Sequence, residues 1–193
     1  TGCTFEAPAN TSTSTHVPFS ISGTKTSATG CGAASGHNNE VNTCTMNNGY
    51  YNTVIYSGTS PYPTGNKIIN CNALDFYMYG IYNYYGQNTE IRGCIVERPT
   101  RTTISTTYAL YLASGSAGCL VQGNHVRRLF EAAPTSTSSV YCLYNASSGT
   151  LGNENRWINN VLSDITHNGP IYGLYIPVYN YVLAYHNTIS LDH

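Results

Sequence analysis

A short motif recurs six times along this chain and constrains its fold more than any other feature. Each copy has an aliphatic or aromatic residue, two variable residues, Asn or Cys, one variable residue and an apolar residue. The copies span residues 41–46, 68–73, 91–96, 121–126, 157–162 and 184–189. Their Asn or Cys residues are Cys44, Cys71, Cys94, Asn124, Asn160 and Asn187, which lie 27, 23, 30, 36 and 27 residues apart. Repeats at intervals of roughly 20 to 50 residues are typical of solenoids. A fragment of the motif at residues 2–5 indicates one earlier turn.

A second pattern follows each of the first five motifs in the same order. It is an aliphatic residue followed by tyrosine: Ile55-Tyr56, Ile81-Tyr82, Leu110-Tyr111, Leu143-Tyr144 and Leu174-Tyr175. Short alternating segments rich in Val, Ile, Tyr and Thr, separated by turns of Gly, Asn and Ser, are typical of β-strands. No segment of useful length has helical periodicity. The sequence therefore predicts an all-β fold, a parallel β-helix of about six or seven coils.

The Asn or Cys column has a physical reason in such a fold. Asn tolerates the left-handed backbone conformation that a tight corner needs, and its amide can bond to the Asn one coil away. Cys is small and partly apolar, so it suits a stack at the same corner. We expect these six residues to lie in one line, with Val41, Ile68, Ile91, Val121 and Trp157 pointing into the core.

Composition indicates the setting of the protein. Charged residues make up 9% of the 193 residues, against roughly 25% in an ordinary globular protein. The net charge is −1 and the basic residues are scattered, so no nucleic-acid partner is expected. No apolar run is long enough for a membrane span or a signal-peptide core. Low charge with 18 tyrosines favours an extracellular or cell-surface location.

The chain is expected to form one domain, residues 1–193. Residues 1–40 are interpreted as an irregular first coil with a long polar excursion, and residues 41–193 as regular coils. The start at Thr1 without Met is typical of a processed protein or an excised segment.

The seven cysteines have no metal-binding pattern, because neither a CxxC motif nor a Cys/His cluster is present. Cys44, Cys71 and Cys94 share one column, so a stacked row of buried thiols is expected there. A disulfide between adjacent coils is the alternative, since the strand spacing of about 4.8 Å falls within the Cα range of disulfides. Cys3 and Cys31 lie in the irregular region, where a loop staple is more plausible. No metal and no cofactor are predicted.

The repeats resemble the right-handed parallel β-helix superfamily, the fold of pectate lyases, polygalacturonases and many adhesins. The segments 159–165, 172–175 and 185–192 resemble the repeat regions of very large cell-surface proteins that Bacteroidota secrete through type nine secretion. The resemblance covers about residues 38–193. It implies the fold and a surface origin, and it leaves activity open because the same coils form enzymes and stalks.

Catalysis by this fold would require converging carboxylates. Polygalacturonase-like chemistry needs an acid and a base at one glycosidic bond, and pectate-lyase-like chemistry needs a Ca²⁺ cage beside a base. The nine carboxylates of this chain are spread singly. One column does place charges together, four residues after the Asn or Cys: Asp75, Arg98, Arg128 and Asp164. A surface salt-bridge ladder is the expected reading, and an acid/base site with Glu97 and His125 is the weak alternative.

The tyrosines form the better functional candidate. If the aliphatic partner of each pair points inward, then Tyr56, Tyr82, Tyr111, Tyr144 and Tyr175 line the outer face. They could form a contact surface for a neighbouring subunit, another domain or a surface glycan. Alternatively, loops cover them, or they replace charge as a surface coat.

The favoured function is a structural or adhesive module that forms a stiff rod or head-to-tail filament. No capping segment is visible at either end, and open solenoid ends expose unpaired backbone. The partners expected are therefore copies of the protein or adjoining domains, end to end. The alternative is a carbohydrate-binding or carbohydrate-cleaving module; whether it is an enzyme stays open, with no activity favoured.

Overall fold

The computed structural model describes residues 2–24, 26–32, 36–177 and 179–191. The described chain forms three parallel sheets, here called A, B and C. Sheet A contains, in spatial order, β1 (Thr4–Glu6), β4 (Thr45–Asn47), β7 (Asn72–Leu74), β10 (Ile95–Glu97), β13 (His125–Arg127), β16 (Val161–Ser163) and β19 (Thr188–Ile189). Sheet B contains β2 (Phe19–Ser22), β5 (Tyr51–Tyr56), β8 (Tyr79–Tyr84), β11 (Thr107–Leu112), β14 (Val140–Asn145) and β17 (Ile171–Tyr175). Sheet C contains β3 (Glu40–Asn42), β6 (Lys67–Ile69), β9 (Glu90–Arg92), β12 (Leu120–Gln122), β15 (Asn155–Ile158) and β18 (Val182–Tyr185).

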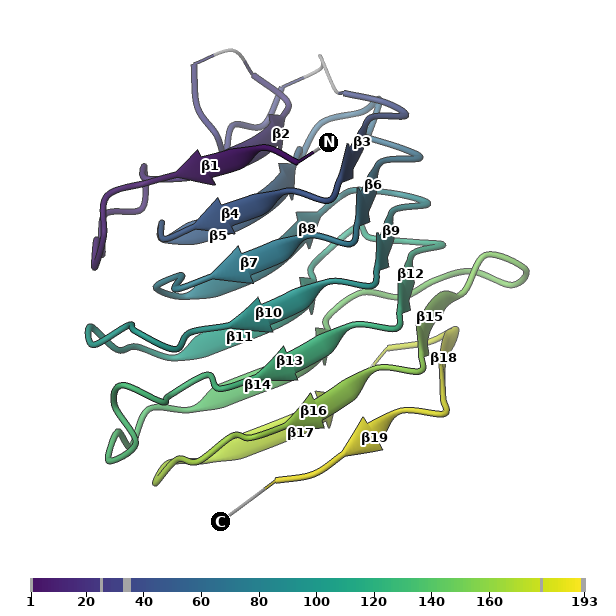
Figure 1. Cartoon of the computed structure of the whole chain (residues 1–193). Coiled ribbons are helices and arrows are strands. Elements are labelled where there is room, and N and C mark those ends of the chain that lie inside the picture. The colour runs from purple at the N-terminus through teal and green to yellow at the C-terminus, as the bar shows by residue number, and fades with distance from the viewer. Residues whose placement is uncertain (1, 25, 33–35, 178, 192–193) are drawn as a thin grey trace.

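The chain visits the sheets in the fixed order A, B, C, and each strand pairs with the strand one coil away. In the described residues this gives six complete coils and, in β19, the start of a seventh. Seen from the N-terminal end, each coil turns clockwise as the chain moves away from the viewer (Figure 1), which is a right-handed path. The predicted β-helix is therefore confirmed. The described residues contain no helix, and hence none that could cross a membrane.

The core is built from columns of apolar side chains, one residue from each coil. The sheet C column is Val41, Ile68, Ile91, Val121, Trp157 and Ala184. The sheet A column is Phe5, Met46, Ala73, Val96, Val126, Leu162 and Ile189. The residues of the middle coils are fully buried. Two positions place a small residue beside a large one, since Trp157 pairs with Ala184 and Ala73 lies between Met46 and Val96.

The corner between sheets C and A carries the repeated motif. The left-handed residue is the one before the Asn or Cys, not the Asn or Cys itself. These left-handed residues are Gly2, Thr43, Asn70, Gly93, Gly123, Asn159 and His186. The expectation that the column residue adopts this conformation was therefore wrong by one position. The preceding residue makes the turn, and the next side chain points inward.

The asparagines of this corner form the expected ladder. Asn124 Nδ2 donates to Asn160 Oδ1 at 2.9 Å, and Asn160 Nδ2 donates to Asn187 Oδ1 at 2.9 Å. Each amide also reaches the preceding coil: Asn160 Nδ2 donates to the Val121 carbonyl at 3.0 Å, and Asn160 Oδ1 accepts from the Asn124 backbone N–H at 3.1 Å. Side chains thus join successive coils where no strand does.

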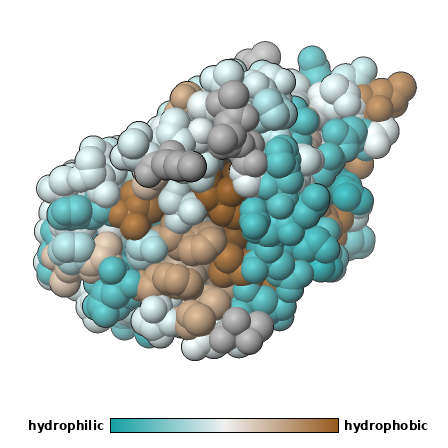
Figure 2. Space-filling view, turned by 90° about the horizontal axis from the view of Figure 1, so that it is seen from above, coloured by the Kyte–Doolittle hydropathy of each residue, from teal (hydrophilic) through white to brown (hydrophobic). Residues whose placement is uncertain are grey.

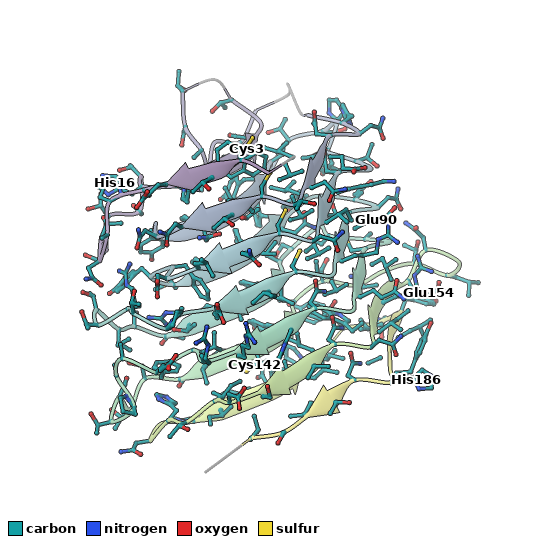
Figure 3. The ribbon with its side chains drawn as sticks, viewed as in Figure 1. Cys3, His16, Glu90, Cys142, Glu154 and His186 are labelled. Carbon is teal, nitrogen blue, oxygen red and sulfur yellow. The ribbon has the colours of Figure 1, made fainter. Side chains whose placement is uncertain are left out.

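The cysteines of the column take the same place as the asparagines. Cys94 Sγ lies 3.5 Å from the Ile68 carbonyl, and Cys71 Sγ lies 3.6 Å from the Val41 carbonyl. In later coils the side-chain amide of Asn contacts the equivalent carbonyl of the preceding coil. Figure 3 shows sulfur atoms one below another, starting near Cys3. All seven cysteines are thiols, so the stacked row of buried thiols is confirmed. Burial raises the pKa of Cys94 to about 12, which keeps its thiol protonated and unreactive.

A second ladder, which the sequence analysis missed, lies at the corner between sheets B and C. Asn39 Nδ2 donates to Asn66 Oδ1 at 3.1 Å, and the Cys119 backbone N–H donates to Asn155 Oδ1 at 3.0 Å. Thr89 takes the same position in the coil between Asn66 and Cys119, and its Oγ1 donates to Asn83 Oδ1 of its own coil at 3.3 Å. The signal was present in the sequence, because these residues all lie five positions before the Asn or Cys of the first ladder.

The first 40 residues contribute β1 and β2 to the sheets, and their polar loops pack against the sides of the coils. The Thr11 carbonyl accepts a hydrogen bond from Arg101 Nη2 at 2.5 Å, which ties the loop after β1 to the fourth coil. Ser20 Oγ donates to the Ala28 carbonyl at 2.6 Å, and the Gly32 carbonyl accepts from Ser57 Oγ at 3.3 Å. The loop after β2 therefore lies along the outer side of the first two coils.

Replacing one ladder amide is expected to destabilise the fold strongly. Asn160→Ala leaves the buried Asn124 N–H without its acceptor and removes the amide that donates to the Val121 carbonyl, which should cost about 3 kcal/mol of unfolding free energy. Asn72→Ala is the matched control, since the Asn72 amide donates on the outer face of sheet A to Thr45 Oγ1. That variant should change stability by at most about 0.5 kcal/mol. Urea unfolding measures both, and equal losses would contradict a structural role for the ladder.

Candidate functional site

The outer face of sheet B carries a surface of tyrosines. Tyr82, Tyr111, Tyr144 and Tyr175 occupy one column of the sheet, one residue per coil. The aliphatic residue before each of them points toward the core, and Ile81, Leu110 and Leu143 are buried. Four of the five predicted tyrosines therefore form the expected stripe.

Tyr56 lies outside this stripe. The register of β5 and β8 pairs Val54 with Tyr82 and Tyr56 with Tyr84. The Ile55-Tyr56 pair was aligned with Ile81-Tyr82 on residue type, and that alignment was wrong by two residues. A shift of two keeps a side chain on the same face of a strand, so the pattern alone could not reveal the error.

A second tyrosine column runs beside the first. It contains Tyr51, Tyr79, Tyr108, Tyr141 and Tyr172. In three coils the two columns are joined by a buried pair, Gly80-Ile81, Ala109-Leu110 or Cys142-Leu143. Two successive inward residues interrupt the alternation, so tyrosines three positions apart share the outer face. The Tyr-x-x-Tyr spacing in four coils was the missed signal.

Only a small residue fits at the first position of this buried pair. A Cβ atom added to Gly80 would lie 2.4 Å from the Ala109 carbonyl oxygen and 2.8 Å from Val96 Cγ1. Ala109 and Cys142 fill the same column in the next two coils. The bend that places both tyrosine columns outward thus depends on small side chains beneath it.

The rings of the second column stack on one another through five coils. The centroid distances along Tyr51, Tyr79, Tyr108, Tyr141 and Tyr172 are 4.8, 5.2, 4.9 and 4.5 Å, with interplanar angles of 6°, 14°, 7° and 6°. The first column is less regular, since Tyr111 and Tyr144 stack at 4.6 Å while Tyr82 and Tyr111 are tilted by 55°. Neighbouring rings therefore cover one another's faces, and the ring edges and hydroxyls are left for solvent.

The tyrosine surface carries no charge at neutral pH. Burial raises the pKa of Tyr79, Tyr82 and Tyr111, and the neighbouring phenols raise it further. Burial and the adjacent Cys31 raise the pKa of Tyr56 to about 12. The surface is an array of neutral hydroxyls, each able to donate and to accept a hydrogen bond.

The loop after β2 reaches one end of this surface. The Gly23 N–H donates to the Tyr56 carbonyl at 2.9 Å, and Cys31 lies beside the Tyr56 and Tyr84 side chains. The expected alternative, coverage by a loop, therefore applies to the Tyr56 end. The tyrosines of the later coils are half-buried by one another, and Tyr172 is exposed.

The column Asp75, Arg98, Arg128 and Asp164 forms at the corner between sheets A and B, but its side chains do not form the expected salt-bridge ladder. Asp75 accepts hydrogen bonds from Thr100, and Arg98 is completely buried. Arg128 instead pairs with Glu97 at 2.8 Å. The backbone explains the difference, because Asp75, Arg128 and Asp164 adopt the left-handed conformation and Arg98 does not.

The weak acid/base alternative is only partly assembled. Arg128 and Asp164 line a groove of about 460 Å³ together with Glu131, Pro134 and Thr166. Asp75 and Arg98 are not among its lining residues. Glu97 is engaged by both Arg127 and Arg128, at 2.9 and 2.8 Å, so its carboxylate acts as an acceptor.

His125 lies close to this groove without a catalytic arrangement. Its Nε2 lies 2.8 Å from Ser163 Oγ, and Ser163 Oγ donates to Asp164 Oδ2 at 3.2 Å. The serine proton is directed to the aspartate, so the histidine is not placed to remove it. Within the described ranges, no group of three or more His, Cys, Asp or Glu residues could hold a metal ion.

The chain matches none of the protein-family models, none of the curated proteins and none of the solved structures with which it was compared. The class of protein is therefore defined by the coil geometry, which is that of a parallel β-solenoid.

The tyrosine surface is expected to make the protein sensitive to alkali. The phenols of the tyrosine surface, such as Tyr82, have a raised pKa in the folded state. Their contribution to stability is therefore present below the ordinary pKa of 10.0 and is lost as the pH rises above that value. Tyr82→Phe removes one such group and keeps the ring. We expect it to retain wild-type stability at pH 7 and to lose less stability between pH 10 and 12. Urea unfolding across this pH range tests this, and identical pH profiles would contradict it.

Proposed function

We propose that this domain is a structural module of a secreted or cell-surface protein, a rigid segment that extends end to end. Its partners are copies of itself or adjoining coils. The observation that carries the proposal is that both coil edges carry apolar residues of the core columns. β17, β18 and β19 form the last strand of their sheets, and β1, β2 and β3 form the first.

The last coil presents core residues rather than polar ones at its free edge. Ile189 belongs to the sheet A core column and is 44% exposed, whereas Leu162 one coil earlier is fully buried. Ala184 belongs to the Trp157 column and is exposed as well. An edge of this kind exposes apolar surface and unpaired backbone groups together, and both favour the addition of another strand.

The first coil presents a matching set of residues. Phe5, Phe19 and Val41 are partly buried and pack against the core. Figure 2 looks onto this end and shows apolar residues between polar flanks. In sheet A, Ile189 of β19 would meet Phe5 of the next copy, whereas sheets B and C end one coil earlier, at β17 and β18, so this contact leaves the position of one strand open in each of them. All three sheets are parallel, so the two edges have the polarity that a continuous stack needs.

A contact between different ends of identical copies does not close on itself, so it extends into a filament. The low charge of the chain removes the repulsion that would oppose such stacking. The resemblance of the repeats to the surface proteins of Bacteroidota and to the pectate-lyase-like superfamily supports an extracellular setting.

Disrupting the C-terminal edge is expected to abolish association. Ile189→Glu places a charge in the core column at the proposed contact. Leu151→Glu is the matched control, because Leu151 is 84% exposed in the turn before β15, away from the coil edges. Sedimentation velocity should show concentration-dependent oligomers for the wild type and Leu151→Glu, and monomers for Ile189→Glu. A wild-type protein that stays monomeric at every concentration would overturn the proposal.

A second candidate function is favoured by the hydroxyl array on sheet B. The tyrosine hydroxyls recur once per coil along a face that is neutral at physiological pH, and a neutral polysaccharide also offers hydroxyls at regular intervals. Hydrogen bonding between the two requires no charge on either side. This is the carbohydrate-binding alternative, and it is compatible with a structural rod.

Removing hydroxyls while keeping rings tests this second candidate. The triple variant Tyr108→Phe, Tyr141→Phe, Tyr144→Phe should bind an uncharged polysaccharide on the order of a hundredfold more weakly, because each of the three lost hydrogen bonds contributes about 1 kcal/mol. Tyr181→Phe, in the loop before β18, is the control. Affinity electrophoresis in gels containing soluble cellulose derivatives, xyloglucan or mannan measures the change. Equal mobility of the wild type and the triple variant in every gel would reject glycan binding by this face.

A further inference from the structure

Arg98 is a cation enclosed in the wall of the solenoid. It follows β10 directly, and its side chain is completely buried. The guanidinium carbon lies 5.4 Å from the centroid of the Phe76 ring and 5.2 Å from that of Phe130. Nη1 donates to Thr107 Oγ1. Two aromatic rings and one hydroxyl thus surround a full positive charge.

One edge of this guanidinium has no partner among the described residues. Nε and Nη2 are both buried and make no hydrogen bond. Their N–H groups lie on the same side of the planar group and are parallel, which is the geometry with which arginine grips an anion through two hydrogen bonds. A buried donor on a charged group destabilises the fold when it has no hydrogen-bond partner, so this edge requires an explanation.

The nearby carboxylates are engaged elsewhere. Asp75 accepts from the Thr100 N–H at 2.9 Å and from the Thr100 hydroxyl at 2.8 Å. Glu97 pairs with Arg127 and Arg128. Neither is hydrogen-bonded to Nε or Nη2 of Arg98.

A second buried guanidinium makes the local charge more positive. Arg101 is 1% exposed and uses its nitrogens on the backbone carbonyls of Thr103, Asp75 and Thr11. Carbonyl groups satisfy its hydrogen bonds and bring no compensating charge. Burial and the nearby Arg101 lower the pKa of Arg98 to about 9, against an opposing effect of Asp75, so Arg98 remains protonated at pH 7.

We propose that the Nε and Nη2 edge of Arg98 binds a small monovalent anion of halide size, held between the third and fifth coils beside Phe76 and Phe130. The anion accepts both free N–H groups and compensates the buried charge. Asp75 and Glu97 cannot do so while they hold Thr100, Arg127 and Arg128. The enclosure of the guanidinium selects a small ion, because a larger anion would have to displace the aromatic rings.

Chloride dependence of stability tests the site. The melting temperature is measured at fixed pH and ionic strength while sodium chloride replaces sodium gluconate. The wild type should show a saturable rise, since a ligand that binds only the folded state stabilises it by mass action. Arg98→Met should show no saturable rise. Arg127→Met, which removes a surface guanidinium, should keep the wild-type response.

A direct measurement covers the case in which Arg98→Met does not fold. Wild-type crystals soaked in sodium bromide should give an anomalous peak within hydrogen-bond distance of Nε and Nη2 of Arg98. A diffraction map without a peak there would overturn the proposal. The same conclusion would follow if Arg98→Met and the wild type had identical chloride responses.

Discussion

The hydrogen bonds of the buried amide ladder hold the coils in register where the strands cannot. The strands of sheets A and C are only two to four residues long, and a pair of that length has little stability by itself. At the corner between them, Asn124, Asn160 and Asn187 join three coils through side-chain and backbone groups. The core columns, the aromatic stacks and the coil edges all depend on this alignment, since a slip of one residue would turn every core side chain outward.

Much of the fold could be predicted because its columns repeat residue types. The Asn or Cys column and the apolar columns on either side of it were recognisable, since each position recurs in a similar chemical form. Other features were not, and three of them show the physical reasons. The left-handed residue before the column varies among Gly, Thr, Asn and His, so it has no single letter. Tyr56 was placed two residues out of register because a shift of two preserves the alternation. The second tyrosine column was missed because the paired inward residues, such as Gly80-Ile81, interrupt the period of two on which strand prediction relies.

The candidate site was predicted in outline, and its character changed once the rings were placed. A row of tyrosines on the outer face was expected; the rings of Tyr79, Tyr108 and Tyr141 in addition cover one another and present hydroxyls. The prediction for the charged column Asp75, Arg98, Arg128 and Asp164 differed more from the structure. Arg98 has the same position in the repeat as Asp75 and Arg128. Its backbone is not left-handed as theirs is, and its side chain enters the core. The position in the repeat determines where the Cα atom of a residue lies. Its backbone conformation determines whether its charged side chain points to solvent or into the core.

The amide ladder also has a direction. Asn160 accepts from the Asn124 N–H and donates to the Val121 carbonyl, so it completes the coil before its own. The Asn160 N–H in turn donates to Asn187 Oδ1. The backbone N–H groups of Cys94, Asn124 and Asn160 therefore find their acceptors only when the following coil is in place. A chain that emerges N-terminus first from a ribosome or a secretion channel always has its incomplete coil at the growing end. From this direction we expect assembly along the ladder to be vectorial, with the coils completed in the order in which their residues emerge.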